Sequence, residues 1–348
     1  MTPDRTMKAA FVTKYGGPEV LEIRETPIPK PAPDQILVRV RAFGLNFADV
    51  MGRFGVYPGT PRPPFILGLE FSGEVAGIGE NVTHFKGGER VMGYSRHGSH
   101  AQYVCVNEKL AVELPAKMEF EEGAAFLVMY LTAYHGIVRL ANIRKGEKLL
   151  VHAASGGAGI ATLQLGKHLG AEIFGTAGTE DKIKLALKNG ADHVINYNTT
   201  DFAGEIKRIT NNYGVDVVMD SVGGLVYDKS WDLLAPMGRY VLYGLAAIAS
   251  QGALNKLKAA TIISVMKPIF PVQLMSANKS IFGFNLGTLK GKESYFREAV
   301  IEMLRLYDGG VLKPLIGRTF RFNEIVEAHR ALQTRQTVGK VVVHVDTE

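Results

Sequence analysis

Cysteine is almost absent from this sequence of 348 residues, in which Cys105 is the only one. A single thiol excludes a disulfide framework and a zinc lobe built from four cysteines. It fits a reducing compartment, and we expect a cytoplasmic protein. The chain is long enough to bury a core without covalent staples, and its length predicts two domains.

Long apolar runs are also missing. The first residues lack the length and flanks of a signal peptide, and no window holds the roughly eighteen apolar residues that a spanning helix needs. The most apolar stretch lies in a segment at 246–280 and is broken by Lys267, Pro268 and Pro271. We expect a buried helix or an interface element there. Peripheral membrane contact through an amphipathic insert is the alternative.

Blocks of like charge are absent as well. Lysine and arginine total 40 against 34 acidic residues, and these charges are scattered along the chain. A net charge of +6 without a basic cluster does not indicate nucleic-acid binding. We therefore expect a small-molecule substrate and no nucleic-acid partner.

The hydrophobic pattern changes along the chain. Residues 7–112 show short β-like runs between glycines and prolines, and the last residues return to this style. After Gly146, six apolar strands alternate with helices, which predicts a doubly wound parallel sheet in an α/β fold. Within it we expect a helix over 225–238 and a strand over 239–244. The predicted domains are 1–128 with 288–348, and 129–287.

A glycine-rich turn follows the first strand of this alternation. Residues 153–159 read Ala-Ala-Ser-Gly-Gly-Ala-Gly and lead into a helical pattern. Small residues let the backbone approach a pyrophosphate, and the helix N-terminus offers N–H groups and a positive dipole. Because strand, turn and helix occur in this order, the motif predicts dinucleotide binding rather than a plain turn.

The choice between NADH and NADPH depends on the second strand. An NAD site needs an acidic residue where that strand ends, and residues 175–179 contain none. Lys182 and Tyr197 follow nearby, and a lysine and a hydroxyl suit a 2′-phosphate. We predict NADPH, while an ordinary surface position for Lys182 stays open.

The layout resembles the medium-chain dehydrogenase/reductase superfamily. In its zinc-dependent members a C-x-x-D run and a G-H-E run supply metal ligands. Here Asn46 and Leu69 stand where the cysteine and histidine would be, and the third position, near Val128, is apolar. Glu70 alone cannot hold zinc, so we expect no metal site. Without a Lewis acid, hydride transfer favours an acceptor activated by conjugation, namely a quinone or an α,β-unsaturated carbonyl.

Longer runs carry a closer resemblance to the zinc-free quinone oxidoreductases, and especially to the vesicle amine transport protein homologues. Among them are "LGLEFSGEVAGIGENV", "VHAASGGAGIATLQLGK", "GVDVVMDSVGG" and "VGKVVV". The resemblance implies a GroES-like β-rich domain, a Rossmann domain and an NADPH-dependent reductase. It also implies a homodimer formed through the strand near "SIFGFN". A cofactor-binding interaction protein at a vesicle surface, with little or no catalysis, remains the rival.

Residue roles follow from the same resemblance. Asn46 and Tyr57 correspond to polar groups beside the nicotinamide, and we expect them to act in catalysis. Tyr57 is the candidate hydrogen-bond donor to the developing oxyanion, and a structural tyrosine before Pro58 is the alternative. The expected cofactor-binding residues are Asn46, Tyr130, Thr132, Ser155, Gly156, Gly157, Ala158, Thr176, Lys182, Tyr197, Val222, Gly244, Phe284 and Asn285.

Overall fold

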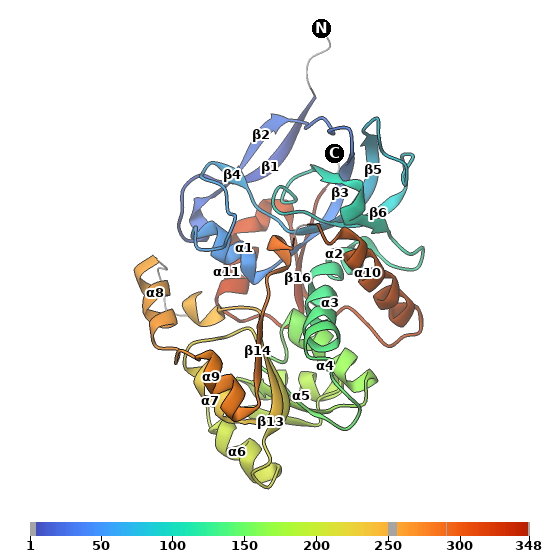
Figure 1. The fold of residues 1–348 in the computed structure, drawn as a ribbon. Coiled ribbons are helices and arrows are strands. Elements are labelled where there is room, and N and C mark those ends of the chain that lie inside the picture. Colours follow the sequence, from blue (N-terminus) through green and yellow to red (C-terminus); the bar gives the residue numbers. More distant parts are fainter. Residues whose placement is uncertain (1–4, 250–255, 290, 347–348) are drawn as a thin grey trace. The chain divides into compact units, whose positions relative to one another are not determined.

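The computed structural model describes residues 5–249, 256–289 and 291–346. The chain forms two compact units (Figure 1). The first contains residues 1–128, 287–302 and 314–348, and the second contains 129–286 and 303–313. The chain thus leaves the first unit after Val128 and returns to it later. We had expected all of 288–348 in the first unit, whereas residues 303–313 pack with the second.

The first unit is built around the long strand β3 (Gln35–Leu45) of a seven-stranded sheet. Antiparallel to β3 run β5 (Glu70–Ile78), β7 (Tyr103–Asn107) and the C-terminal strand β16 (Lys340–His344). The other strands of this unit are β1 (Thr6–Val12), β2 (Leu21–Pro27), β4 (Phe65–Ile66), β6 (Arg90–Tyr94), β8 (Ala111–Glu113) and β15 (Ile316–Arg321). Its helices are α1 (Phe47–Arg53), α2 (Phe120–Ala124) and α11 (Ile325–Gln333), while α3 (Leu127–Ala133) and α10 (Glu293–Asp308) extend across the division of the chain.

The second unit is a six-stranded sheet in the order β11-β10-β9-β12-β13-β14. All its strand pairs are parallel, which confirms the predicted doubly wound sheet. The strands are β9 (Lys148–Val151), β10 (Glu172–Ala177), β11 (His193–Asn196), β12 (Val215–Asp220), β13 (Leu234–Leu242) and β14 (Ser280–Gly283). The helices between them include α4 (Gly157–His168), α5 (Glu180–Lys188), α6 (Phe202–Ile209) and α7 (Leu225–Asp232). This strand order reverses direction between β9 and β12, where such sheets bind ligands.

The helix expected over 225–238 is wrong in its second half. Helix α7 ends at Asp232, and β13 already begins at Leu234. Leu234 is buried and pairs with Val215, and the register of this pairing shifts before Val217. The apolar run there serves sheet pairing instead of a helix face, and Met237 takes a positive φ of 64°.

The segment at 246–280 contains two short helices, α8 (Lys256–Ser264) and α9 (Pro271–Ala277), while residues 250–255 lie outside the described part. No residue of α9 is buried, so for this element the expectation of a buried helix is wrong, and that of an interface element stays a prediction. Val272 and Met275 are 69% and 76% exposed, and the preceding Phe270 is 61% exposed. Among the described helices, none is long and apolar enough to cross a membrane.

Two histidines are buried in the core of the first unit. The His100 ring stacks on Phe43 at a centroid distance of 4.4 Å and meets His329 edge-on at 5.5 Å. Their ring nitrogens have no hydrogen-bond partner among the described residues. Burial lowers the pKa of His100 to about 3, and burial together with His100 and Arg53 lowers the pKa of His329 well below its usual value.

These depressed pKa values predict acid sensitivity. The unfolded chain binds protons on both histidines below about pH 6.5, whereas the folded chain does not. The contribution of the two histidines to the free energy of unfolding is therefore fully present above that pH and is lost progressively as the pH decreases. We expect His329→Phe to flatten the fall in unfolding free energy between pH 7 and pH 5, measured by urea denaturation. The exposed His168, changed to Gln, is the control, and equal slopes for the parent and His329→Phe would contradict the prediction.

Candidate functional site

The residues predicted to bind the cofactor in the second unit follow the carboxyl ends of successive parallel strands. Ser155 to Ala158 follow β9, Thr176 is the second-last residue of β10, and Tyr197 directly follows β11. Val222, Gly244 and Phe284 with Asn285 come after β12, β13 and β14. Carboxyl ends of parallel strands share one edge, so the topology brings these sequence-distant residues to the same edge of the sheet.

The glycine-rich turn packs its backbone too tightly for side chains at one position. A Cβ atom on Gly159 would lie 2.4 Å from the Ala153 carbonyl oxygen and 2.8 Å from Ala154. At Gly156, the N-cap of α4, the nearest atom would be the same oxygen at 3.3 Å. Gly159 thus allows α4 to approach the end of β9 closely. Gly156 leaves the entrance of the turn free of a side chain. This cradle has the form required by a pyrophosphate at a helix N-terminus.

A buried polar network supports the cradle. The Ser230 hydroxyl donates to the Val226 carbonyl at 2.7 Å, so it accepts from His152 Nε2, also at 2.7 Å. His152 Nδ1 then accepts the hydroxyl hydrogen of Thr176 at 3.0 Å. Burial lowers the pKa of His152, although Asp220 opposes this, and the neutral ring fits both contacts. The Thr176 hydroxyl is therefore held by a contact inside the protein.

Asp220, the last residue of β12, shapes the neighbouring turn. Its Oδ1 accepts from the backbone N–H of Val222 at 2.7 Å, and its Oδ2 accepts from the Tyr240 hydroxyl at 2.6 Å. Two strands along, the Phe284 ring stacks on Tyr243 at 6.0 Å and contacts His135 edge-on at 4.7 Å. The turns after β12, β13 and β14 are thus fixed by contacts within the second unit.

The remaining predicted residues of this unit differ in environment. Tyr130 is fully buried and donates its hydroxyl to Gln164 Oε1 at 2.8 Å, and Thr132 is buried near it in α3. Lys182 is half-buried in the first turn of α5, which Thr179 caps. The Tyr197 side chain is 49% exposed. Among the predicted cofactor residues near the ends of β10 and β11, Lys182 and Tyr197 thus have accessible polar groups.

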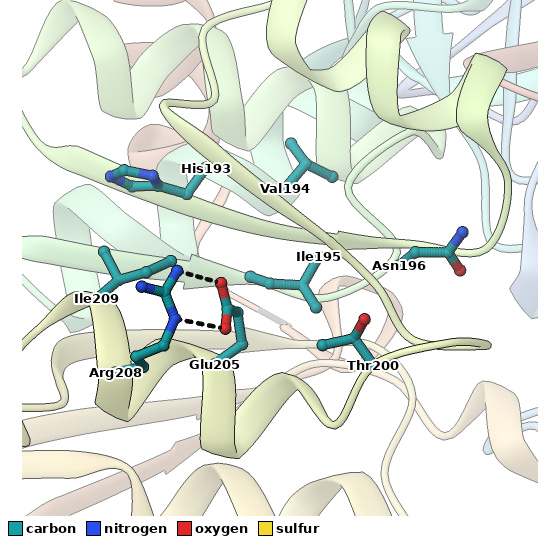
Figure 2. A pocket seen from close by; sticks show the side chains of 8 residues that line it. All are labelled: His193, Val194, Ile195, Asn196, Thr200, Glu205, Arg208 and Ile209. Atoms are coloured by element: carbon teal, nitrogen blue, oxygen red, sulfur yellow. Dashed lines mark hydrogen bonds and ion pairs between the residues drawn. The ribbon is translucent and has the colours of Figure 1, made fainter.

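An open groove of about 610 Å³ lies between β11 and α6 (Figure 2). Glu205 and Arg208 form an ion pair on its α6 side, with N···O of 2.7 Å. The other lining residues are His193, Val194, Ile195, Asn196, Thr200 and Ile209. The groove contains none of the predicted cofactor residues, although Asn196 directly precedes Tyr197.

In the first unit, three strands bring a lysine, an asparagine and a glutamate together. Val341 of β16 pairs with Leu45 of β3, so Lys340 lies beside Asn46. Lys340 Nζ donates to Asn46 Oδ1 at 2.7 Å and forms a short ion pair with Glu70 Oε1. Asn46 Nδ2 donates to the same glutamate oxygen at 2.9 Å, and Glu70 Oε2 accepts from the Val128 N–H at 3.1 Å. Lys340 and Glu70 are buried.

Further ionisable groups surround this cluster, defined here as Asn46, Glu70 and Lys340. Asp49 is buried and accepts from the Asn46 backbone N–H at 2.7 Å. Burial raises its pKa to about 7, while the Asn46 hydrogen bond and the Lys340 charge act in the opposite direction. Burial also raises the pKa of Tyr94, and nearby Tyr57 and Asp49 add to this shift. Tyr57 and Asp49 thus both lie near Tyr94, and Asp49 is hydrogen-bonded to Asn46. The two expected catalytic residues, Tyr57 and Asn46, therefore share these neighbours.

No role was predicted from the sequence for Lys340, His152 or Asp49. For Lys340 a signal existed, because a charged residue opens the buried strand "KVVVH" and needs a buried partner there. His152 also stands at the end of an apolar strand. Their partners could not be identified from sequence, since Glu70 precedes Lys340 by 270 residues.

Comparison with known proteins identifies the family. Residues 32–116 match the alcohol dehydrogenase GroES-like domain, and residues 189–343 match the domain described as zinc-binding dehydrogenase. The rat synaptic vesicle membrane protein VAT-1 homolog is 38% identical over 97% of this chain and 84% of its own length. Human quinone oxidoreductase is 32% identical over 98% of this chain and 99% of its own.

A solved structure agrees with these matches. Escherichia coli quinone oxidoreductase complexed with NADPH has a TM-score of 0.86 and 32% identity, covering 98% of this chain and 100% of that one. The fold is therefore a GroES-like β domain with a Rossmann domain, the architecture of a dehydrogenase. The chain belongs to the quinone oxidoreductase-like proteins of the medium-chain dehydrogenase/reductase superfamily.

The zinc implied by one domain description does not fit the residues present. Zinc in proteins is held by Cys, His and carboxylate ligands. Both oxygens of Glu70 are engaged by protein donors, and Leu69 beside it is buried and apolar. Among the described residues, no group of three or more His, Cys, Asp or Glu side chains is arranged to hold a metal ion.

The two glycines of the turn give a stability test. Gly159→Ala places a Cβ against two backbone groups, which cannot move away as a flexible side chain could. We expect a loss of roughly 1–3 kcal/mol in unfolding free energy by urea denaturation. Gly156→Ala meets one oxygen at 3.3 Å and should lose much less. Equal losses would show that the close approach of α4 is not the constraint.

Proposed function

We propose that this protein is an NADPH-dependent oxidoreductase that transfers hydride to a quinone or an α,β-unsaturated carbonyl without a zinc ion. The observation that carries the proposal is the cradle at Gly156 and Gly159, in a chain whose equivalent of the metal site holds Lys340 and Glu70. The resemblance to quinone oxidoreductases, one of which was solved with NADPH, supports the same conclusion.

The residues of the second unit fit a dinucleotide. The first turn of α4 presents backbone N–H groups that have no partner within the helix, and these suit a pyrophosphate. Residues 175–179 offer no carboxylate to a ribose hydroxyl. Lys182 and Tyr197 are accessible at the ends of β10 and β11, where they suit a 2′-phosphate. Together these features favour NADPH over NADH.

When bound, NADPH supplies a hydride. The role of this chain is then to bind and orient the reactants, to exclude water, and to stabilise negative charge on the acceptor oxygen. A conjugated acceptor spreads that charge, so it needs a hydrogen bond rather than a metal ion. We assign this task to Tyr57 and the polar groups around Asn46, and the cofactor contacts to the residues named at the strand ends and in α3.

The test is turnover by the purified chain. We expect consumption of NADPH with a panel of quinones and enones, followed by absorbance and by product analysis, and no loss of rate after EDTA treatment. The variant Gly156→Val is the control, because its side chain fills the mouth of the cradle and should abolish NADPH binding while the fold is kept. Tight NADPH binding with no turnover of any acceptor would contradict the proposed reaction.

A second test separates the two nicotinamide cofactors. Lys182→Ala should raise the dissociation constant for NADPH roughly 10- to 100-fold, the value of one charge-assisted contact to phosphate. The dissociation constant for NADH should change less than about threefold, since NADH lacks this phosphate. The control is Lys184→Ala, an exposed lysine of the same helix, and both constants are measured by fluorescence titration. Equal losses for the two cofactors would remove Lys182 from the phosphate site.

One observation favours a second candidate function. The exposed apolar side chains at Phe270, Val272 and Met275 are not among the residues assigned to the dinucleotide. Together with the likeness to a synaptic vesicle membrane protein homolog, they suit an NADPH-binding interaction protein that contacts a partner or a membrane surface. Turnover of a quinone or enone decides between the two.

We also propose a homodimer that pairs through β14. This strand is at the edge of the six-stranded sheet, and its residues Ile281 and Phe282 are only partly buried. An edge strand with unpaired backbone groups is a suitable place for a second copy to extend the sheet.

A further inference from the structure

The cluster of Asn46, Glu70 and Lys340 is unusual for a protein interior. The Lys340 side chain is 3% exposed and the Glu70 side chain is fully buried. Removing two charges from water costs several kcal/mol for each ion, which is recovered only where geometry is good and further hydrogen bonds are made. Here the contacts are made: Glu70 accepts from Lys340, Asn46 and Val128, and Lys340 also donates to Asn46.

The backbone around the cluster is adapted to the lysine. A Cβ on Gly44 would lie 2.6 Å from Lys340 Cε and 2.1 Å from the Ala124 carbonyl oxygen. The lysine stem therefore lies close against the backbone of β3 at a residue without a side chain. The pairing of β16 with β3 fixes the point at which the stem enters.

The contacts also determine which way the Asn46 amide is turned. Its Oδ1 faces an ammonium, which can only donate, and its Nδ2 faces a carboxylate, which accepts. The reversed amide would place NH₂ against the ammonium and oxygen against the carboxylate. Lys340 and Glu70 therefore permit one orientation of Asn46 and oppose the other.

We propose that the Lys340 ammonium is the resident cation of this site: it takes the place of a metal ion, orients the Asn46 amide, and neutralises Glu70. Lys340 is thus a positioning residue that acts through Asn46. Its part in catalysis rests on the proposed reductase function, whereas its part as resident cation does not.

The experiment compares four full-length variants with the parent. Lys340→Arg keeps the charge, and Lys340→Met removes the charge but keeps most of the stem. Lys340→Met combined with Glu70→Gln removes both charges, while the glutamine oxygen can still accept from Asn46. Lys148→Met is the control, because it removes a partly buried lysine that is ion-paired to Glu172 in the second unit.

Stability and metal content are read first and do not depend on activity. We expect Lys340→Met to lower the melting temperature strongly, because Glu70 is left buried without its cation. The double variant should recover most of this loss, while Lys340→Arg and Lys148→Met should lose little. The parent should contain less than about 0.1 equivalent of zinc by elemental analysis. One equivalent of zinc in the parent, or no recovery of the melting temperature in the double variant, would overturn the proposal that Lys340 is the resident cation.

Activity then tests positioning. The double variant should keep a kcat at least about tenfold below the parent with a nearly unchanged KM for NADPH, because Asn46 has lost the donor that orients it. Lys340→Arg should recover most of the kcat. A double variant with parent-like kcat would overturn the positioning role and leave Lys340 as a neutralising charge.

If the parent reduces no acceptor, the proposed function fails and orientation is read by NMR. Asparagine is labelled with ¹⁵N, and Asn46→Asp identifies the Asn46 side-chain signal. We expect slow hydrogen exchange and a distinct shift in the parent, both lost in the double variant. An unchanged Asn46 signal in the double variant would overturn the proposal without reference to activity.

Discussion

The pairing of β16 with β3 is the contact on which much of the first unit depends. It joins the last strand of the chain to one of the first, and it places Lys340 beside Asn46 and opposite Glu70. Without it, Glu70 would be a buried carboxylate with no cation near it. A single strand pairing thus joins β15 and β16 to the rest of the sheet and supplies the charge that the cluster needs. The strand pairing that builds the sheet therefore also determines the charge balance of the buried cluster.

The second unit depends on a different constraint, the close approach of α4 to the end of β9. Gly159 allows this approach. The hydrogen bonds of His152 with Thr176 and Ser230 hold the strand ends in place. Both sites follow the same physical rule. In each site the protein itself supplies the polar or charged groups that water would otherwise have to provide. Each site also relies on a glycine, Gly159 or Gly44, at a position that has no room for a side chain.

Much of this was predictable from sequence because it depends on local patterns. Strand, turn and helix around residues 153–159 follow from small residues and periodicity, and the six-stranded parallel sheet follows from the alternation. The helix prediction over 225–238 was wrong because Leu234 pairs with β12, and this pairing is not visible in the local periodicity. Likewise, hydropathy alone predicts that the apolar residues of α9 are buried, whereas in the structure none of them is buried.

The candidate site in the first unit could be predicted only in part. The absence of zinc ligands at Asn46 and Leu69 is visible in the sequence, but what replaces the metal is not. A lysine is normally a surface residue, and only the sheet register reveals that Lys340 is held inside. His100 and His329 show the same limit, since two buried rings whose nitrogens have no hydrogen-bond partner among the described residues arise from tertiary packing alone.

The division of the chain has a consequence for biosynthesis. All six strands of the Rossmann sheet leave the ribosome before β16 does, because that sheet is complete at Gly283 and β16 begins at Lys340. The first unit therefore waits as an unfinished sheet, with Glu70 unneutralised, while the domain translated after it can already fold. Completion of the first unit thus follows synthesis of the whole Rossmann sheet, and a nascent chain stopped just before Lys340 would carry a complete six-stranded sheet and an incomplete first unit.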